Sequence, residues 1–307
     1  MKSESLYIFN CILIIILIPI ILFLCHNRIQ KKQDKNEITI LVLDKGSKNI
    51  ISMPFEEYVW RATAKEVPSS FEDDAIMAQA VAVRTYAYRK LGKKISEHNG
   101  ADVCTDFNHC TAFLLPGDEE KTYGENAKQL CKRYRTLSKK TQNQILTYNN
   151  EPILAAFHAI SSGRTEKSSD VWSEQLPYLI NVDSELDKNV NGYLSTVSLK
   201  QTELKNYFSD NADTNISIIS RTDGGNVKEI NIFGNIYTGQ DVRNKLNLRS
   251  ANFSVKKNKD EYIFEVYGYG HGVGMSQCGA NEYAKKGMDY QKILLKYFPN
   301  TVLSTIN

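Results

Sequence analysis

The sequence predicts an α+β fold, with a mixed or mostly antiparallel sheet and packed helices, preceded by one N-terminal transmembrane helix. Two observations predict this class: short strand-like runs alternate with Gly/Asn turns from residue 216 onward, and periodic apolar runs typical of helices occupy much of the rest. The chain has 307 residues, 42% hydrophobic and 24% charged, as is usual for globular proteins. Its net charge of +3, without a basic stripe, argues against a nucleic-acid partner.

The N-terminal region differs from the rest of the chain. After a short tail at 1–6, residues 7–25 carry no charge and are long enough to cross a bilayer as a helix. No small-x-small cleavage site follows, so we expect an uncleaved signal-anchor, a polar linker at 26–36 and a soluble domain at 37–307. Four Lys or Arg side chains follow the span, and the positive-inside rule taken alone places the domain in the cytoplasm.

Two local signals mark the start of the domain. Pro68 disfavours helical backbone at Val67, so a helix opened by Pro54 ends just before it. Ser70 and Asp73 have the spacing of a capping box for the next helix. The predicted strands are 38–43 and the hairpin 144–148 with 153–157, and the predicted helices are 55–64, 70–88, 125–137, 199–208, 240–246, 276–286 and 290–298.

Glu66 is the first candidate for chemistry. It lies at a corner between two helices, flanked by Ala64, Val67 and Pro68. A carboxyl group in partly apolar surroundings has a raised pKa and holds a proton near neutral pH, as a general acid must. The competing interpretation is a solvated glutamate at a helix C-terminus.

Arg84 is the second candidate. Its helical neighbours three and four residues away are Ala80, Val81, Ala87 and Tyr88, so the guanidinium lies on an apolar face. Such a group pairs with a carboxylate or a substrate oxygen, or reaches out to water.

His98, Cys104 and Cys110 form the third candidate. Two thiolates and an imidazole in one loop suit a tetrahedral zinc site. His109 is an alternative nitrogen ligand, although we expect its side chain to point away from that of Cys110. A Cys104–Cys110 disulfide and free thiols are the competing interpretations.

Two polar segments complete the set. Residues 157–172 follow a strand and are rich in hydroxyls, a composition that suits sugar binding or an ordinary polar surface loop. Residues 268–280 contain five glycines and His271, which predicts close backbone approach or positive φ, either at a site or in a simple turn.

The order of these motifs resembles the stage II sporulation protein D family. The resemblance covers most of residues 37–300 and rests on separated motifs: Glu66-Val-Pro68, Ala78–Ala87, Phe157–Trp172 with Pro177–Leu179, Gly268–Ala280, Ala284-x2-Gly287 and Ile293–Phe298. Two positions depart from the common pattern, Cys278 in place of an aromatic residue and Ser162-Gly-Arg164 in place of a second glycine. They affect the expected detail of the cleft and leave the Glu66 assignment intact.

The resemblance implies a peptidoglycan lytic transglycosylase of sporulation engulfment. Such an enzyme cleaves the MurNAc–GlcNAc β-1,4 bond to a 1,6-anhydro-MurNAc end, prefers strands stripped of stem peptides, and acts with the sporulation amidase/endopeptidase protein P and membrane protein M. Glu66 is then the catalytic acid and base, and the remaining candidates are substrate-binding residues: Arg84, Ser161, Ser162, His271, Ser276 and Gln277.

The resemblance also bears on the metal and the topology. The His98, Cys104 and Cys110 spacing matches zinc-binding clostridial-type members, which implies one structural zinc that takes no part in bond cleavage. The family places the domain outside the mother-cell membrane, facing the wall, against the charge bias. The alternative functions are a zinc-dependent wall amidase and a glycan-binding scaffold without catalysis.

Overall fold

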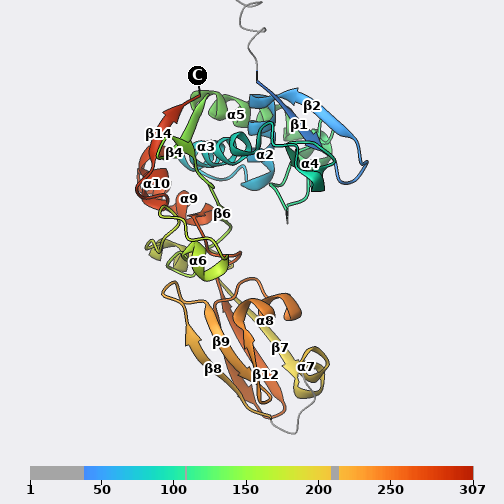
Figure 1. The fold of residues 1–307 in the computed structure, drawn as a ribbon, viewed down its shortest axis with the longest axis vertical. Helices are drawn as coiled ribbons and strands as arrows, with labels where there is room; N and C mark the ends of the chain where they lie inside the picture. Colours follow the sequence, from blue (N-terminus) through green and yellow to red (C-terminus); the bar gives the residue numbers. More distant parts are fainter. Residues whose placement is uncertain (1–37, 108, 209–213, 307) are drawn as a thin grey trace, which may run out of the picture.

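The computed structural model describes residues 38–107, 109–208 and 214–306. These residues form two lobes along the long axis of the molecule, joined by a narrower waist (Figure 1). We call residues 38–160 and 275–306 the helical lobe, residues 190–267 the sheet lobe, and residues 161–189 with 268–274 the waist.

Helix α3 (Asp73–Lys90) is the centre of the helical lobe. Its alanines are fully or almost fully buried, and these small side chains let neighbouring helices and strands approach closely. Helix α2 (Phe55–Glu66) packs beside it, in agreement with the predicted helix, and Glu66 is its last residue. The other elements of this part of the chain are β1 (Thr39–Leu43), β2 (Ile50–Pro54), β3 (Val103–Cys104), α4 (Glu119–Tyr123), α5 (Ala127–Lys140), β4 (Gln144–Tyr148), β5 (Glu151–Pro152) and β6 (Phe157–His158).

The capping box predicted at Ser70 and Asp73 is wrong. Helix α3 begins at Asp73 after Glu72, and no side chain caps it. The backbone N–H of Glu72 instead donates to Asn281 Oδ1 at 2.8 Å. The Asn281 side chain, from near the other end of the sequence, therefore accepts a hydrogen bond from a backbone N–H group at the start of the helix, as a local N-cap residue normally does.

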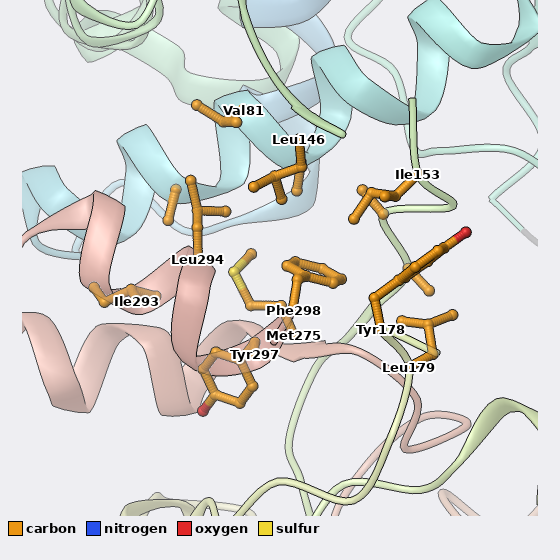
Figure 2. Close-up of a cluster of buried hydrophobic side chains, with 14 of the residues drawn as sticks. Val81, Leu146, Ile153, Tyr178, Leu179, Met275, Ile293, Leu294, Tyr297 and Phe298 are labelled. Carbon is orange, nitrogen blue, oxygen red and sulfur yellow. The ribbon is translucent and has the colours of Figure 1, made fainter. Parts of the chain in front are cut away.

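The end of the chain completes the helical lobe. Leu294 and Phe298 pack against Val81 and Leu146 in one buried cluster (Figure 2). The last strand pairs antiparallel with β4, so segments far apart in sequence share a sheet. The elements involved are β13 (Met275–Ser276), α9 (Gln277–Lys285), α10 (Tyr290–Tyr297) and β14 (Val302–Thr305).

The described residues of the sheet lobe form two antiparallel sheets and two helices. One sheet has the order β11-β12-β7 and the other β10-β9-β8. Phe253 and Phe264 lie between them, buried and in edge-on contact at 5.7 Å between ring centroids. The elements are β7 (Leu194–Lys200), α7 (Gln201–Tyr207), β8 (Ile216–Arg221), β9 (Val227–Ile232), β10 (Asn235–Thr238), α8 (Gly239–Leu246), β11 (Phe253–Asn258) and β12 (Glu261–Tyr267).

The α+β class is confirmed, with several small and mainly antiparallel sheets in place of one larger sheet. The strand predicted at 153–157 is wrong over most of its length, because pairing with β4 ends at Pro152. No helix in the described ranges is long and apolar enough to span a bilayer. The predicted transmembrane segment at 7–25 and the linker at 26–36 lie outside these ranges.

Candidate functional site

A cavity of about 910 Å³ lies where the two lobes meet. The helical lobe and the sheet lobe both contribute to its wall, and the waist supplies Trp172 and His271. The lining residues are Glu66, Tyr86, Phe107, His109, Cys110, Thr111, Leu154–Ala159, Trp172, Arg243, Asn247, Leu248, Arg249, Tyr269, Gly270, His271 and Gln277.

Glu66 occupies this cavity wall because helix α2 ends there. Val67 is extended, as expected for a residue before proline, and turns the chain away after Glu66. The backbone N–H of Ala112 donates to Glu66 Oε1 at 2.6 Å. Burial raises the pKa of Glu66 to about 6, although the bonds from Ala112 and Gln277 oppose the rise. A carboxyl group with this pKa both donates and accepts a proton near neutral pH.

Gln277 is the second predicted residue that the structure brings to Glu66. Its Nε2 donates to Glu66 Oε2 at 3.3 Å. Gln277 is the first residue of α9, and the Ser276 hydroxyl caps that helix by accepting from the N–H of Gly279 at 3.1 Å. The cap therefore fixes the helix start that presents the Gln277 amide to the acid.

Two histidines line the cavity in their neutral form. His271 Nδ1 accepts from the N–H of Val273 at 3.0 Å, and His158 Nδ1 lies 3.1 Å from the carbonyl oxygen of the same residue. Burial lowers the pKa of His158 to about 3 and that of His271 to about 4. His158 Nε2 is left as a buried acceptor with no protein partner in the described part of the chain. It is thus available to a hydroxyl donor in the cavity.

Phe, Tyr and Trp side chains line the cavity at five positions: Tyr86, Phe107, Phe157, Trp172 and Tyr269. Phe107 is 73% exposed and Tyr269 is 46% exposed, which is unusual for rings of this size. Trp172 lies 5.1 Å from the His271 ring. Exposed flat rings beside polar groups are suited to cover the faces of sugar rings.

The glycine-rich segment runs along the waist. Gly268, Gly270, Gly272 and Gly274 all have φ between 74° and 115°. A Cβ at Gly268 or Gly274 would collide with the carbonyl oxygen of Ile160 or Ala156. These glycines therefore allow close contact with the protein's own backbone. The sequence had left open whether such contact would be made at a binding site or in a simple turn.

Arg84 does not line the cavity. Its side chain is fully buried between α2 and α5, where Nε and Nη2 each donate to the Glu56 carboxylate at 2.8 Å. It also donates to the carbonyl oxygens of Ser138 and Gln144. Every donor group is used within the protein, which assigns Arg84 to holding α2, α3 and α5 together.

Ser161 and Ser276 are also fully buried, and they meet around a carboxylate that the sequence did not single out. Asp187 Oδ1 accepts from the Ser276 hydroxyl at 2.5 Å and from the N–H of Ser161 at 3.0 Å. Asp187 Oδ2 accepts from the Ser184 hydroxyl at 2.5 Å. Ser162 lies outside the cavity lining, where its hydroxyl donates to the carbonyl of Gly224 at 3.4 Å.

The predicted metal ligands come together at the edge of the cavity with a fourth donor. The donor atoms of His98, Cys104, His109 and Cys110 all lie within 4.8 Å of one another. The expectation that His109 points away from Cys110 is wrong, since their donor atoms are 3.8 Å apart. The backbone N–H groups of His109 and Cys110 both donate to the carbonyl oxygen of Asp106, and His109 Nδ1 lies 3.6 Å from Cys104 Sγ.

This donor set could hold a metal ion, and two thiols with two imidazoles are a ligand set that zinc takes. Zinc–nitrogen and zinc–sulfur bonds of about 2.0–2.3 Å give edges of about 3.3–3.8 Å in a tetrahedron. The Cys110–His98, Cys104–His109 and Cys110–His109 donor atoms are 3.4, 3.6 and 3.8 Å apart, and the His98–His109 separation is shorter, at 2.9 Å. Cys104 and Cys110 are free thiols in this structure. Four protein donors leave no open position, which is typical of structural sites. Cys110 is followed two residues later by Ala112, whose N–H holds Glu66.

Sequence reasoning missed several residues of the cavity. Arg243 and Arg249 come from the sheet lobe, and His158 comes from the short strand β6. Their local sequence gives no sign of a site, because the lobes meet only in the folded chain. His158 lies within residues 157–172, and the hydroxyl-rich composition of that segment was the one indication that it belongs to a site.

Comparison with known proteins places the chain in a family. A family model described as Stage II sporulation protein matches residues 44–148. The chain is 33% identical over 271 residues to Stage II sporulation protein D of Bacillus subtilis (strain 168), covering 87% of this chain and 79% of that protein. It is 32% identical over 274 residues to Stage II sporulation protein D of Bacillus amyloliquefaciens, with 88% and 80% covered. A more distant relative, the amidase enhancer of Bacillus subtilis (strain 168), is 26% identical over 298 residues, which are 78% of this chain and 39% of that protein. The chain belongs to the stage II sporulation protein D family.

Proposed function

We propose that this chain is a peptidoglycan lytic transglycosylase that acts during sporulation, with Glu66 as its catalytic acid and base. Membership of the family implies a role in sporulation. The reaction is the cleavage of MurNAc–GlcNAc β-1,4 bonds to 1,6-anhydro-MurNAc ends.

One observation carries this proposal. Among the described residues that line the cavity, Glu66 is the one carboxylate, and burial raises its pKa to about 6. A glycoside hydrolase of the common type needs two carboxyl groups flanking the scissile bond. A transglycosylase needs one, since the attacking hydroxyl belongs to the substrate.

The proposed reaction uses Glu66 twice. Protonated Glu66 gives its proton to the glycosidic oxygen, the C1–O bond breaks, and the GlcNAc end leaves with a 4-hydroxyl. The MurNAc C6 hydroxyl then attacks C1 and gives its proton to the Glu66 carboxylate. The products are a 1,6-anhydro-MurNAc end and an acid in its starting state, with no water added.

The neighbours of Glu66 support this cycle. The Ala112 N–H and the Gln277 amide each hold one carboxyl oxygen, so the group keeps its orientation in both protonation states. Their bonds favour the ionised form and stop burial from raising the pKa further. His271 and His158 stay neutral near pH 7 and offer hydrogen bonds to sugar hydroxyls.

Zinc is proposed as a structural ion, held by His98, Cys104, His109 and Cys110. When bound, it supplies a cross-link within the irregular loop. The loop residues then order Ala112 beside Glu66, and Lys90 Nζ lies 3.3 Å from Cys110 Sγ.

The location and partners are proposed from the family and from the N-terminal sequence. Residues 7–25 anchor the chain in the mother-cell membrane with the domain outside, where peptidoglycan is found. This orientation overrides the charge bias after the span. The proposed partners are glycan strands, the sporulation amidase/endopeptidase protein P and the membrane protein M.

Mass spectrometry of products from purified glycan strands tests the function. The wild type should release fragments with anhydro-MurNAc ends, and Glu66→Gln should lower the rate at least about 100-fold with the fold intact. Glu57→Gln is the control, because this second glutamate of α2 does not line the cavity. An active Glu66→Gln variant would reject the assignment.

A zinc-dependent amidase is the second candidate, because Cys110 and His109 border the same cavity. It predicts that a chelator abolishes activity at once and that the products are free peptides. The closed set of four protein donors argues against it. A glycan-binding scaffold predicts that wild type yields neither product and that binding survives Glu66→Gln.

A further inference from the structure

The sheet lobe presents an arginine without an acidic partner to the cavity. Arg243 lies in α8, is half-buried, and makes no ion pair with any Asp or Glu among the described residues. Its electrostatic neighbours are Tyr269, His158 and His271, none of which is a carboxylate. A guanidinium that loses water without gaining a counter-ion is costly unless a ligand supplies the negative charge.

The cavity lining contains a second arginine, which shares Tyr269 as a neighbour with Arg243. Arg249 lines the same cavity, and its guanidinium lies 4.3 Å from the centre of the Tyr269 ring. Stacking on this ring orients the plane of the guanidinium, whose N–H groups make no hydrogen bond with the described residues. Arg243 and Arg249 are the cationic side chains of the cavity lining, so the sheet-lobe wall is positive and the helical-lobe wall carries the acid Glu66.

Two planar guanidinium groups suit a carboxylate, which accepts paired hydrogen bonds from such forks. On a peptidoglycan strand the sugar hydroxyls and N-acetyl groups are neutral. The lactyl ether of MurNAc is a carboxylate when no peptide is attached, and becomes a neutral amide once a stem peptide is joined to it. Charge at this position therefore distinguishes bare strands from peptide-bearing ones.

We propose that Arg243 and Arg249 form a carboxylate subsite that binds the lactyl group of peptide-free MurNAc while Glu66 addresses the glycosidic bond from the other lobe. The inference rests on the proposed glycan-cleaving function. It names a specificity device on the sheet lobe, separate from the acid on the helical lobe, and gives a physical reason for choosing strands that have lost their peptides.

Binding measurements on the full-length chain in detergent test the subsite. The probes are peptide-free MurNAc–GlcNAc strands and the same strands with their carboxyl groups chemically reduced to alcohols. The wild type should bind the carboxylated strands at least about 10-fold more tightly. Arg243→Gln and Arg249→Gln should each remove most of this preference and leave the Kd for the reduced strands unchanged, which also reports that the cavity is folded.

Lys245→Gln is the matched control. Lys245 is an exposed cation of the same helix and lies outside the cavity lining. Lys245→Gln should leave the preference for carboxylated strands unchanged. If it lowers this preference, the effect of the arginine variants comes from the loss of net positive charge and not from the subsite. Equal binding of both strands by the wild type would overturn the inference, as would an equal loss for both strands in the arginine variants.

The readout separates this inference from the proposed function. Binding preference requires no bond cleavage, so a wild type that prefers carboxylated strands but releases no anhydro ends would reject the catalytic proposal alone. A wild type that releases anhydro ends at equal rates from both strands would reject the subsite alone.

Discussion

Glu66 and Gln277 are separated by 211 residues in the chain, and the Gln277 amide donates to Glu66 Oε2 across 3.3 Å. The acid ends helix α2 and the amide begins helix α9. The amide favours the charged form of the acid, whereas burial favours the neutral form, and burial is the larger effect. The proton affinity of Glu66 is therefore set jointly by the two ends of the domain.

Gln277→Ala should move the pH dependence of glycan cleavage. The general acid must be protonated, so activity falls as pH rises through the pKa of Glu66, about 6 in the wild type. Removing a donor that stabilises the carboxylate raises this pKa, and the alkaline limb should shift upward. A pH profile of kcat/KM measures this shift, with Gln291→Ala at an exposed position of helix α10 as control. An unshifted limb would show that the 3.3 Å contact has no electrostatic effect.

Glu66→Gln should change the pH dependence of stability. The pKa rises from 4.5 to about 6 on folding, so protonated Glu66 contributes stability that is complete below pH 4.5 and is lost as pH rises through 6. The difference corresponds to about 2 kcal/mol. Relative to wild type, the variant should therefore gain about 2 kcal/mol in free energy of unfolding between pH 4 and pH 8, as measured by urea titration. A difference independent of pH would contradict the burial of this carboxyl.

Metal analysis of the purified chain should give about one zinc per molecule. Cys104→Ser and His109→Ala should each lower occupancy, because both supply donors to the same cluster. Loss of the ion should reduce glycan cleavage gradually, through disorder of the loop that carries Ala112, and addition of zinc should restore it. Cys131→Ser, at a buried cysteine outside the cluster, is the control. A metal-free wild type with a Cys104–Cys110 disulfide would refute the prediction.

Arg84→Ala should destabilise the fold with little effect on substrate binding. The substitution leaves the Glu56 carboxylate without its partner in a largely buried site, a change that costs about 3–5 kcal/mol. Thermal unfolding measures the loss, and KM measured well below the new Tm should match that of the wild type. Arg89→Ala, at a half-buried position of the same helix, should cost far less. A raised KM with an unchanged Tm would show that Arg84 binds substrate and would contradict its structural role.

Asp187→Ala should weaken the waist. Three donors, from Ser161, Ser184 and Ser276, lose their acceptor in a buried setting, and the expected loss is at least about 2 kcal/mol. Asp183→Ala is the control, because that side chain is 78% exposed. Equal unfolding midpoints for the two variants in urea would show that the hydroxyls find other partners.

Local patterns in the sequence predicted most helices, since proline, alanine content and apolar spacing act within a few residues. Helix α2 ends at Glu66, because Pro68 disfavours helical backbone at Val67. Helix α10 lies within one residue of its predicted bounds. The capping box failed because Asn281 supplies the acceptor from 209 residues away. The same reason explains why β14, paired with β4, gave no signal.

The candidate site was predictable to the extent that its chemistry lies in single residues. Glu66, Gln277, His271 and the metal cluster were found from their neighbours in the chain. Arg84 and Ser276 were predicted to bind substrate, but in the structure they bind the carboxylates of Glu56 and Asp187. Nothing in the sequence identifies these partners, because only the fold brings them together. Arg243 and Lys245 are both basic residues of α8, and the sequence does not distinguish their roles. Arg243 lines the cavity and Lys245 does not, because the two lobes meet on the Arg243 side of the helix.

The helical lobe has a consequence for how the protein is made. Its first segments include α2 and α3, and its last include α9, α10 and β14, with the whole sheet lobe synthesised in between. As the chain leaves the ribosome, the apolar face that Val81 and Leu146 present stays uncovered until the final segments arrive. The amide of Gln277 reaches Glu66 at the same late moment. A nascent or truncated chain that lacks α9 therefore carries Glu66 without the Gln277 amide and without a finished cavity.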